Sequence, residues 1–114
     1  MKAAVTLKKN YEFRRVYSKG KSGVSPFLVV YARANHSGKN RMGVTVSTKL
    51  GGAVVRNRIR RRLRELYRLS LPRLRRGYDV VLVGRSRALR AGGEEMRRAF
   101  LRCCAAAGLL EAEE

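Results

Sequence analysis

The sequence predicts an α+β fold, built as a single-domain two-layer α-β sandwich, and three observations support this prediction. Apolar residues recur with the period of an amphipathic helix in residues 11–19, 53–70 and 94–107. Runs rich in β-branched and aromatic residues occupy 27–34, 41–47 and 78–84. The resulting order, α-β-β-β-α-β-α, segregates helices onto one sheet, and 114 residues suit a single domain spanning 1–114.

The N-terminal segment is predicted to be an arm followed by a helix. Residues 1–8 form a short basic arm that we expect to be loose. Asn10 can cap the helix over residues 11–19, and Gly20 can end it.

Two aromatic residues, Phe13 and Tyr17, share one face of this helix with Val16. Core packing is the ordinary use of such a pair. The competing use is a stacking platform, because unpaired bases stack on aromatic rings at about 1–3 kcal/mol each. The residues alone leave both uses open.

Two strands are predicted to follow as a hairpin. Pro26 precedes the first, 27–34; the turn-rich residues 35–40 form the hairpin loop; and 41–47 returns antiparallel. A short edge strand is expected at 22–24. The small polar face of the return strand, around Thr45, leaves room for a nucleic-acid strand, although a face exposed to water would look the same.

The C-terminal third contains one strand and one helix. Residues 78–84 are apolar on both faces, which predicts an inner strand. Glu94 and Glu95 suit the positive end of the last helix, and Gly108 can end it. The acidic tail, 109–114, is expected to fray.

The segment from Gly51 to Arg68 holds seven arginines and a single acid, Glu65. As a helix it has an apolar stripe, which comprises Val55, Ile59, Leu63 and Leu66, with Tyr67 and Leu69 at the edges. The opposite side carries Asn57, Arg60, Arg61, Arg64 and Arg68. Like charges four residues apart destabilise an isolated helix by roughly 0.2–0.5 kcal/mol per pair. Solvated faces usually mix signs, so this one-sign face predicts a polyanionic partner.

The overall charge points the same way. The net charge is +19 and the pI is about 11.5, which favours a nucleic-acid partner. A membrane surface would require an exposed apolar helix face, and here that face is committed to the core. Adjacent Cys103 and Cys104 indicate reduced core thiols, and no apolar run reaches the ~20 residues of a membrane span. We therefore expect a cytoplasmic protein that does not bind membranes.

No catalytic constellation is present in the sequence. His36 is the only histidine, and five of the eight acids lie in residues 94–114. Nuclease chemistry in a protein usually needs acids or histidines that hold Mg²⁺ or move protons. The sequence predicts a binding subunit with no metal site or cofactor of its own and no stable protein partner.

Four segments together resemble one family. A-V-V-R-N-R-I-R-R-R-L-R resembles the arginine-rich signature of the bacterial ribonuclease P protein subunit. Y-E-F-R-R-V-Y-S-K-G, G-V-T-V-S-T-K-L-G-G and Y-D-V-V-L-V-G-R resemble its first helix, the segment before its arginine helix and its last strand. The resemblance covers roughly residues 7–104 in order.

The resemblance implies a fold, a partner and an activity. The fold is an α-β sandwich with a left-handed βαβ crossover, where general rules favour a right-handed one. The partner is a catalytic RNA, one per protein, that uses Mg²⁺ to remove the 5′ leader of precursor tRNA endonucleolytically. The protein would be a single RNA-binding domain and a subunit of that holoenzyme, without catalytic residues of its own.

The resemblance also assigns residues. The signature facing the catalytic RNA matches Arg56, Asn57, Arg58, Arg61 and Arg64, and the charged helix face adds Arg60 and Arg68. The groove that holds the single-stranded leader matches Phe13, Tyr17, Lys49 and Arg85. Two departures are Tyr17, where phenylalanine is common, and Gly52, where asparagine is common.

Three other interpretations remain. A structural ribosomal RNA-binding protein is the first alternative, and it would not need Phe13 and Tyr17 to face a groove. A DNA-binding protein would bind duplexes, usually as a symmetric dimer. A nuclease that acts alone would need the missing metal ligands.

Overall fold

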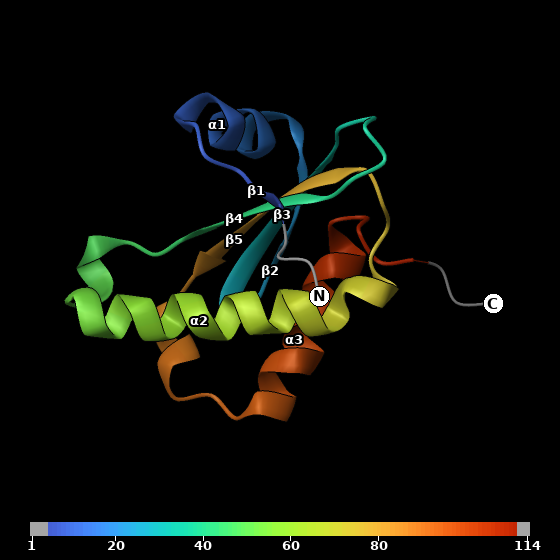
Figure 1. Ribbon diagram of the computed structural model, residues 1–114. Helices are drawn as coiled ribbons and strands as arrows, with labels where there is room; N and C mark the ends of the chain where they lie inside the picture. Colours follow the sequence, from blue (N-terminus) through green and yellow to red (C-terminus); the bar gives the residue numbers. More distant parts are fainter. Residues whose placement is uncertain (1–4, 112–114) are drawn as a thin grey trace.

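The computed structural model describes residues 5–111, which form one five-stranded sheet and three α-helices (Figure 1). The strands are β1 (Val5–Thr6), β2 (Lys21–Val24), β3 (Leu28–Ala34), β4 (Arg41–Thr45) and β5 (Tyr78–Gly84). The helices are α1 (Asn10–Lys19), α2 (Ala53–Ser70) and α3 (Gly93–Ala106), with short 3₁₀ turns η1 (Thr48–Leu50), η2 (Leu71–Arg73) and η3 (Ser86–Leu89). The predicted α+β class and element order are confirmed, with β1 as an additional strand.

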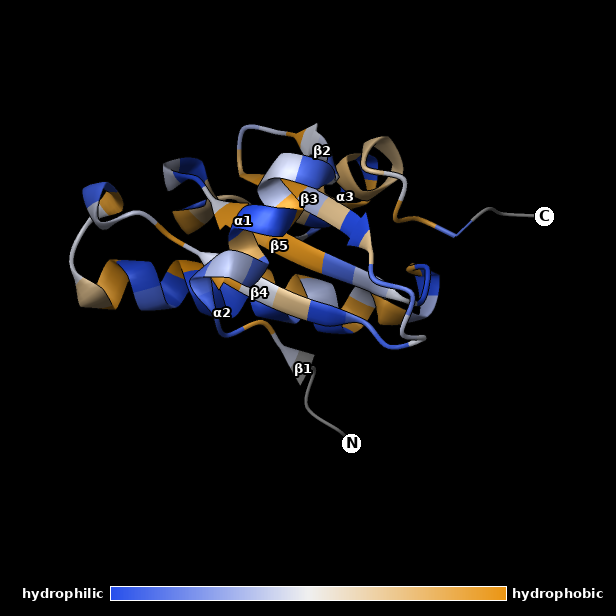
Figure 2. Ribbon diagram, turned by 90° about the horizontal axis from the view of Figure 1, so that it is seen from above, coloured by the Kyte–Doolittle hydropathy of each residue, from blue (hydrophilic) through white to orange (hydrophobic). Residues whose placement is uncertain are grey.

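Helices cover both faces of the sheet. α2 and α3 lie on one face and α1 on the other (Figures 1 and 2). The larger core lies under α2 and α3 and includes Leu28, Leu82 and Phe100. The smaller core, beneath α1, contains Leu7, Val16 and Val81. The two-layer sandwich of sheet, α2 and α3 is therefore extended by α1 as a small third layer.

The sheet order is β1-β4-β5-β3-β2, so β5 is the central strand. It pairs antiparallel with β3 over the full strand and parallel with β4. The prediction of an inner strand is confirmed, and Figure 2 shows hydrophobic colours along much of β5. The predicted hairpin between β3 and β4 is wrong, because β5 lies between them. A strand that is apolar on both faces is stabilised most at the sheet centre, where both faces are covered.

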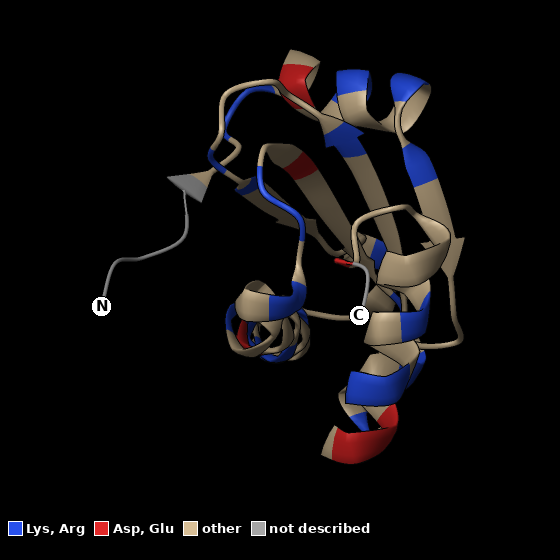
Figure 3. Cartoon of the chain, turned by 90° about the vertical axis from the view of Figure 1, so that its right-hand side faces the viewer, with Lys and Arg blue, Asp and Glu red and all other residues tan. Residues whose placement is uncertain are grey.

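The connection from β4 through α2 to β5 is a left-handed crossover. In Figure 3 the viewer looks along β4 and β5 as they run away, with α2 below the sheet and β5 to the right of β4. The chain thus turns counterclockwise as it recedes. Almost all such connections are right-handed, and this one agrees with the crossover that the resemblance implies.

Both chain ends are more ordered than predicted within the described residues. Thr6 pairs with Met42 of β4, and Leu7 is buried. At the other end Leu109 is fully buried, and Leu110 bridges to Leu74. The apolar side chains at 7 and 109 explain this docking, because burying them removes apolar area from water. The predicted loose arm and frayed tail are therefore wrong for 5–8 and 109–111, while 1–4 and 112–114 lie outside the described residues.

The helix boundaries follow local chemistry. α2 ends at Ser70, as the proline at position 72 predicts. The N-cap of α1 is Lys9, and not Asn10 as predicted. The free amides there are satisfied by Glu12, whose Oε1 accepts from the backbone N–H groups of Lys8 and Lys9 at 3.0 Å each.

The apolar stripe of α2 is rotated slightly from its predicted position. Ile59 and Leu63 are fully buried, as predicted, and Tyr67 is buried with them. Leu69 is 63 % exposed, and Leu66 is half-buried. Ile59, Leu63 and Tyr67 are four residues apart and therefore lie along the sheet-facing side of α2. Leu69 lies off this line and is turned toward α3.

A buried carboxylate ties the sheet to α1. Asp79 of β5 is 2 % exposed and accepts hydrogen bonds from Arg41 at 2.8 and 2.9 Å and from Asn35 at 2.8 Å. Arg41 also contacts Glu12 of α1 at 2.7 Å. Burial raises the pKa of Asp79, but the hydrogen bonds from Arg41 and Asn35 outweigh it, so the pKa is lowered overall. Backbone donors lower the pKa of Glu12 as well.

We expect Asp79→Asn to lower the free energy of unfolding by about 2–3 kcal/mol, because it removes the more buried of the two carboxylates that pair with Arg41. The pKa of Asp79 is lower in the folded protein than in the unfolded chain, where it is about 4. The ionised carboxylate therefore stabilises the fold at pH values above about 4, and this stabilisation is lost as the pH falls through the pKa of the folded state. The difference between parent and variant should hence be constant near neutrality and shrink in acid. Urea unfolding followed by circular dichroism at several pH values measures this. Glu94→Gln, which breaks an exposed pair, is the control and should leave the free energy of unfolding nearly unchanged.

Candidate nucleic-acid interface

The predicted arginine face lies on the solvent side of α2. Asn57, Arg61, Arg64 and Arg68 are exposed and line a shallow hollow of about 360 Å³. Arg60 is half-buried beside them and donates to Asn57 Oδ1 at 2.9 Å. We call Asn57, Arg60, Arg61, Arg64 and Arg68 the arginine strip. The structure brings together all five residues that the helical period placed there.

The arginines of α2 differ in whether their side chains bond to other groups of the protein. Arg56 donates to the carbonyl of Gly51 at 3.2 Å, and Arg68 pairs with Glu65 at 2.7 Å. Within residues 5–111, Arg61 and Arg64 make no hydrogen bond or ion pair to protein. Their guanidinium groups are therefore the members of the strip that are free to bind an anion, which planar guanidinium groups do bidentately.

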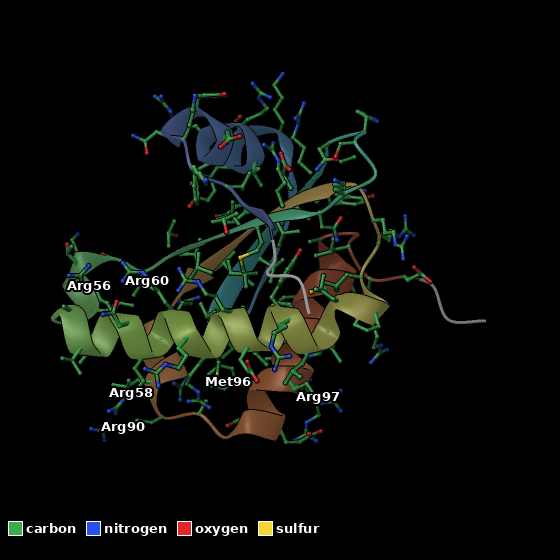
Figure 4. All side chains as sticks on the ribbon, in the orientation of Figure 1. Arg56, Arg58, Arg60, Arg90, Met96 and Arg97 are labelled. Carbon is green, nitrogen blue, oxygen red and sulfur yellow. The ribbon has the colours of Figure 1, made fainter. Side chains whose placement is uncertain are left out.

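Arg56 and Arg58 flank the strip on opposite sides of α2, and Arg60 is the member of the strip nearest the sheet. Figure 4 shows Arg56 and Arg60 on the sheet-facing upper side of α2, and Arg58 below it near Arg90. Arg58 is exposed but points away from the strip. An RNA that contacts Arg58 and Arg60 together would have to reach around the helix.

Arg62 has a structural use that the sequence did not reveal. Its guanidinium donates to the backbone carbonyls of Ala88, Leu89 and Ala91 at 2.7, 3.3 and 2.5 Å. These bonds fasten η3 and the following loop to α2. Nothing in the repeated arginine pattern distinguishes Arg62 from its neighbours, because the carbonyl partners lie 26 to 29 residues further along the chain.

A second candidate surface lies across the sheet, at α1. Phe13 and Tyr17 line a hollow of about 500 Å³ together with Thr45 of β4. Tyr17 is 37 % exposed, its hydroxyl is 3.3 Å from Thr45 Oγ1, and its ring meets Tyr31 edge-on at 4.9 Å. We call Phe13, Tyr17 and Thr45 the aromatic trough. The role of Tyr31 as the support of Tyr17 was not predicted.

The two rings of the trough are not equivalent. Phe13 is half-buried and packs on the smaller core, over Gly43. A Cβ at Gly43 would collide with Cζ of Phe13, so this position requires a residue without a side chain. The space that the small face of β4 leaves at Gly43 is thus filled by Phe13. Tyr17, being more exposed, is the ring available for stacking.

A row of sheet residues that α1 leaves uncovered extends the aromatic trough. Strand register places Thr45 beside Val83, Val83 beside Val29, and Val29 beside Val24. These residues lie on the sheet face that packs against α1, in the row next to the one that α1 covers. Val24 is 67 % exposed, and the other three are half-buried. The row forms a mainly apolar floor across four strands that suits the bases of an extended strand.

The two predicted basic residues of the groove lie outside the aromatic trough. Lys49 is exposed on η1. Arg85 donates to the carbonyl of Ser25 at 3.2 Å and lines a separate hollow with Leu50. The structure therefore brings Phe13 and Tyr17 together but does not place Lys49 or Arg85 in the same cavity.

Acidic residues are few on both surfaces: Glu65 lines the hollow of the arginine strip, and no acid lines the hollow of the aromatic trough. Figure 3 shows acids grouped at the first turn of α3 and isolated elsewhere.

Within residues 5–111, no group of three or more histidines, cysteines or acids lies close enough to hold a metal ion. None of the helices in that range combines the length and apolar character needed to cross a membrane. Cys103 and Cys104 are buried free thiols, and burial raises the pKa of Cys104 to about 12.

An exposed arginine helix on one side of the sheet and an aromatic trough on the other define a small, basic RNA-binding domain. The family model described as Ribonuclease P matches residues 1–108, and the chain belongs to that family. The ribonuclease P protein component of Natranaerobius thermophilus is 41 % identical over 111 residues, covering 97 % of this chain and 96 % of the relative. That of Thermoanaerobacter sp. (strain X514) is 46 % identical over 87 residues, covering 76 % and 75 %.

Solved structures have the same fold. The RNase P protein of Staphylococcus aureus superposes with a TM-score of 0.81 at 30 % identity, covering 95 % of this chain and 99 % of that chain. The RNase P protein from Thermotoga maritima gives a TM-score of 0.75 at 28 % identity, covering 84 % and 91 %. The resemblance inferred from the four sequence segments is confirmed.

We expect the double variant Arg61→Ala, Arg64→Ala to weaken binding to ribonuclease P RNA and to flatten its salt dependence. The slope of log affinity against log salt should fall by about 0.7–0.9 for each phosphate that the variant no longer neutralises. Filter binding over a range of salt concentrations measures both quantities. Arg98→Ala, Arg102→Ala removes the same charge from exposed positions of α3 and is the matched control. Equal slope changes in the two variants would mean that only net charge matters.

Proposed function

We propose that this protein is the RNA-binding subunit of ribonuclease P and assists a catalytic RNA in removing the 5′ leader from precursor tRNA. One protein would bind one RNA. The observation that carries the proposal is the pair of surfaces on opposite sides of the sheet: a one-sign arginine strip and an aromatic trough. Family membership supplies the class of RNA.

The arginine strip suits the folded catalytic RNA. Arg61 and Arg64 are exposed and about one helical turn apart, and neither side chain bonds to another residue within 5–111. Their guanidinium groups would bind phosphates and fix the register of the protein on the RNA. Arg56, Asn57, Arg58, Arg60 and Arg68 complete the proposed contact set.

The aromatic trough suits a single strand. Tyr17 offers a partly exposed ring, and the row from Thr45 to Val24 offers an apolar floor beside it. Bases stack on such rings with little dependence on sequence. Because a duplex hides its base faces, the trough favours the single-stranded leader over the tRNA stem. Lys49 and Arg85 would contact the leader backbone farther along.

Chemistry on the phosphodiester is assigned to the RNA. Mg²⁺ held by the RNA would supply the activated water and stabilise the leaving group. The described residues hold no cluster that fits a metal ion, so the residues of this chain are given no step in bond cleavage. Their contribution is to bind and orient the two RNAs, which raises the effective concentration of the scissile bond at the catalytic centre.

Tyr17→Ala should weaken the holoenzyme's affinity for precursor tRNA by about tenfold, because one base would no longer stack on the ring. Affinity for mature tRNA, which has no leader, should be unchanged. Tyr17→Phe keeps the ring and should behave like the parent. Tyr11→Ala removes an exposed ring from the same helix outside the trough and is the control. An equal loss for precursor and mature tRNA would contradict leader binding in the trough.

The decisive experiment is reconstitution of cleavage at low Mg²⁺. A precursor tRNA is incubated with a bacterial ribonuclease P RNA alone, with the protein alone and with both. We expect efficient cleavage only with both. Cleavage by the repurified protein alone would contradict the assignment of chemistry to the RNA. Tight RNA binding without stimulation would favour the structural ribosomal alternative.

A further inference from the structure

We propose that the groove between α2 and α3 takes an unpaired nucleobase of the RNA that lies on the arginine strip. This inference rests on the proposed function and adds a base contact to the phosphate contacts of the strip. The site lies on the α3 side of α2, on the face of the sheet opposite the aromatic trough.

The groove is the most apolar hollow of the described surface that borders the strip. Its volume is about 620 Å³, and its apolar walls are Leu66, Leu69 and Met96. Figure 4 shows Met96 under α2, with Arg97 beside it on α3. Leu69 is 63 % exposed even though the core side of α2 is well packed. Covering this surface would remove apolar area from water, and a base face is apolar enough to do so.

The groove is continuous with the arginine strip. Arg61 and Glu65 line both the hollow of the strip and the groove. A backbone phosphate held by Arg61 would therefore leave its own base beside the mouth of the groove. One nucleotide could then contact the strip through its phosphate and the groove through its base.

The charges at the rim favour a base over a phosphate. Glu65 and Glu94 both lie at the rim, each paired with an arginine of its own helix, Arg68 and Arg97. These pairings lower the pKa of both glutamates, so they are ionised at neutral pH. Carboxylates repel phosphate, but they accept hydrogen bonds from the amino groups of bases, and the neighbouring guanidinium groups donate to base oxygens and nitrogens.

Leu69→Gln tests the proposal without disturbing the core, since the side chain is exposed. Its control is Val54→Gln, which changes a 74 % exposed side chain on the same helix outside the groove. The affinity of each variant for a bacterial ribonuclease P RNA is measured against salt. We expect Leu69→Gln to weaken binding about five- to tenfold with the parent's salt slope, because the interaction it removes is apolar. Val54→Gln should bind like the parent.

Chemical probing identifies the base. An adenine or cytosine seated in the groove should be protected from dimethyl sulfate in the parent complex and reactive again with Leu69→Gln. Equal affinity and equal protection for parent and variant would overturn the inference while leaving the proposed function intact. A parent that fails to bind the RNA would overturn both. If Leu69→Gln instead abolished self-association of the RNA-free protein in sedimentation, the inference would be overturned in favour of a contact between copies.

Discussion

The structure depends on β5, a strand that must be covered on both of its faces. Val80 and Leu82 point into the larger core, and Val81 into the smaller one, and all three are fully buried. Since each face needs its own helical layer, α1 and the α2–α3 pair are held on opposite sides of one strand. The left-handed crossover follows from placing β5 between β4 and β3, with α2 crossing beneath.

This arrangement separates the two candidate surfaces. α2 packs against the sheet by one stripe and presents the arginine strip to solvent, while α1 leaves a row of β4, β5, β3 and β2 uncovered. A folded RNA on the strip and a single strand in the trough would therefore not compete for the same residues. The sheet fixes the distance between them, as the proposed alignment of two RNAs would require.

The few acids outside the C-terminal region have structural uses that keep these surfaces positive. Asp79 is buried against Arg41, and Glu12 joins the same network while capping α1. Glu65 is the exception, because it lies on α2 at the edge of the strip, paired with Arg68. Glu65 lies at the mouth of the α2–α3 groove, between the arginine strip, which would contact phosphates, and the groove, which would contact a base.

The sequence by itself determined the class of the fold, the order of its elements, the inner character of β5 and the composition of the arginine strip. These are local properties, since periodicity and residue type specify which side of an element is apolar. Only the tertiary structure decided that β5 separates β3 from β4, that Tyr67 rather than Leu69 is buried, and that Arg62 fastens a loop. It also decided that Phe13 fills the space over Gly43 while Lys49 and Arg85 lie outside that trough. Each of these depends on which residues distant in sequence the fold brings together, and such pairing leaves no periodic pattern in the chain.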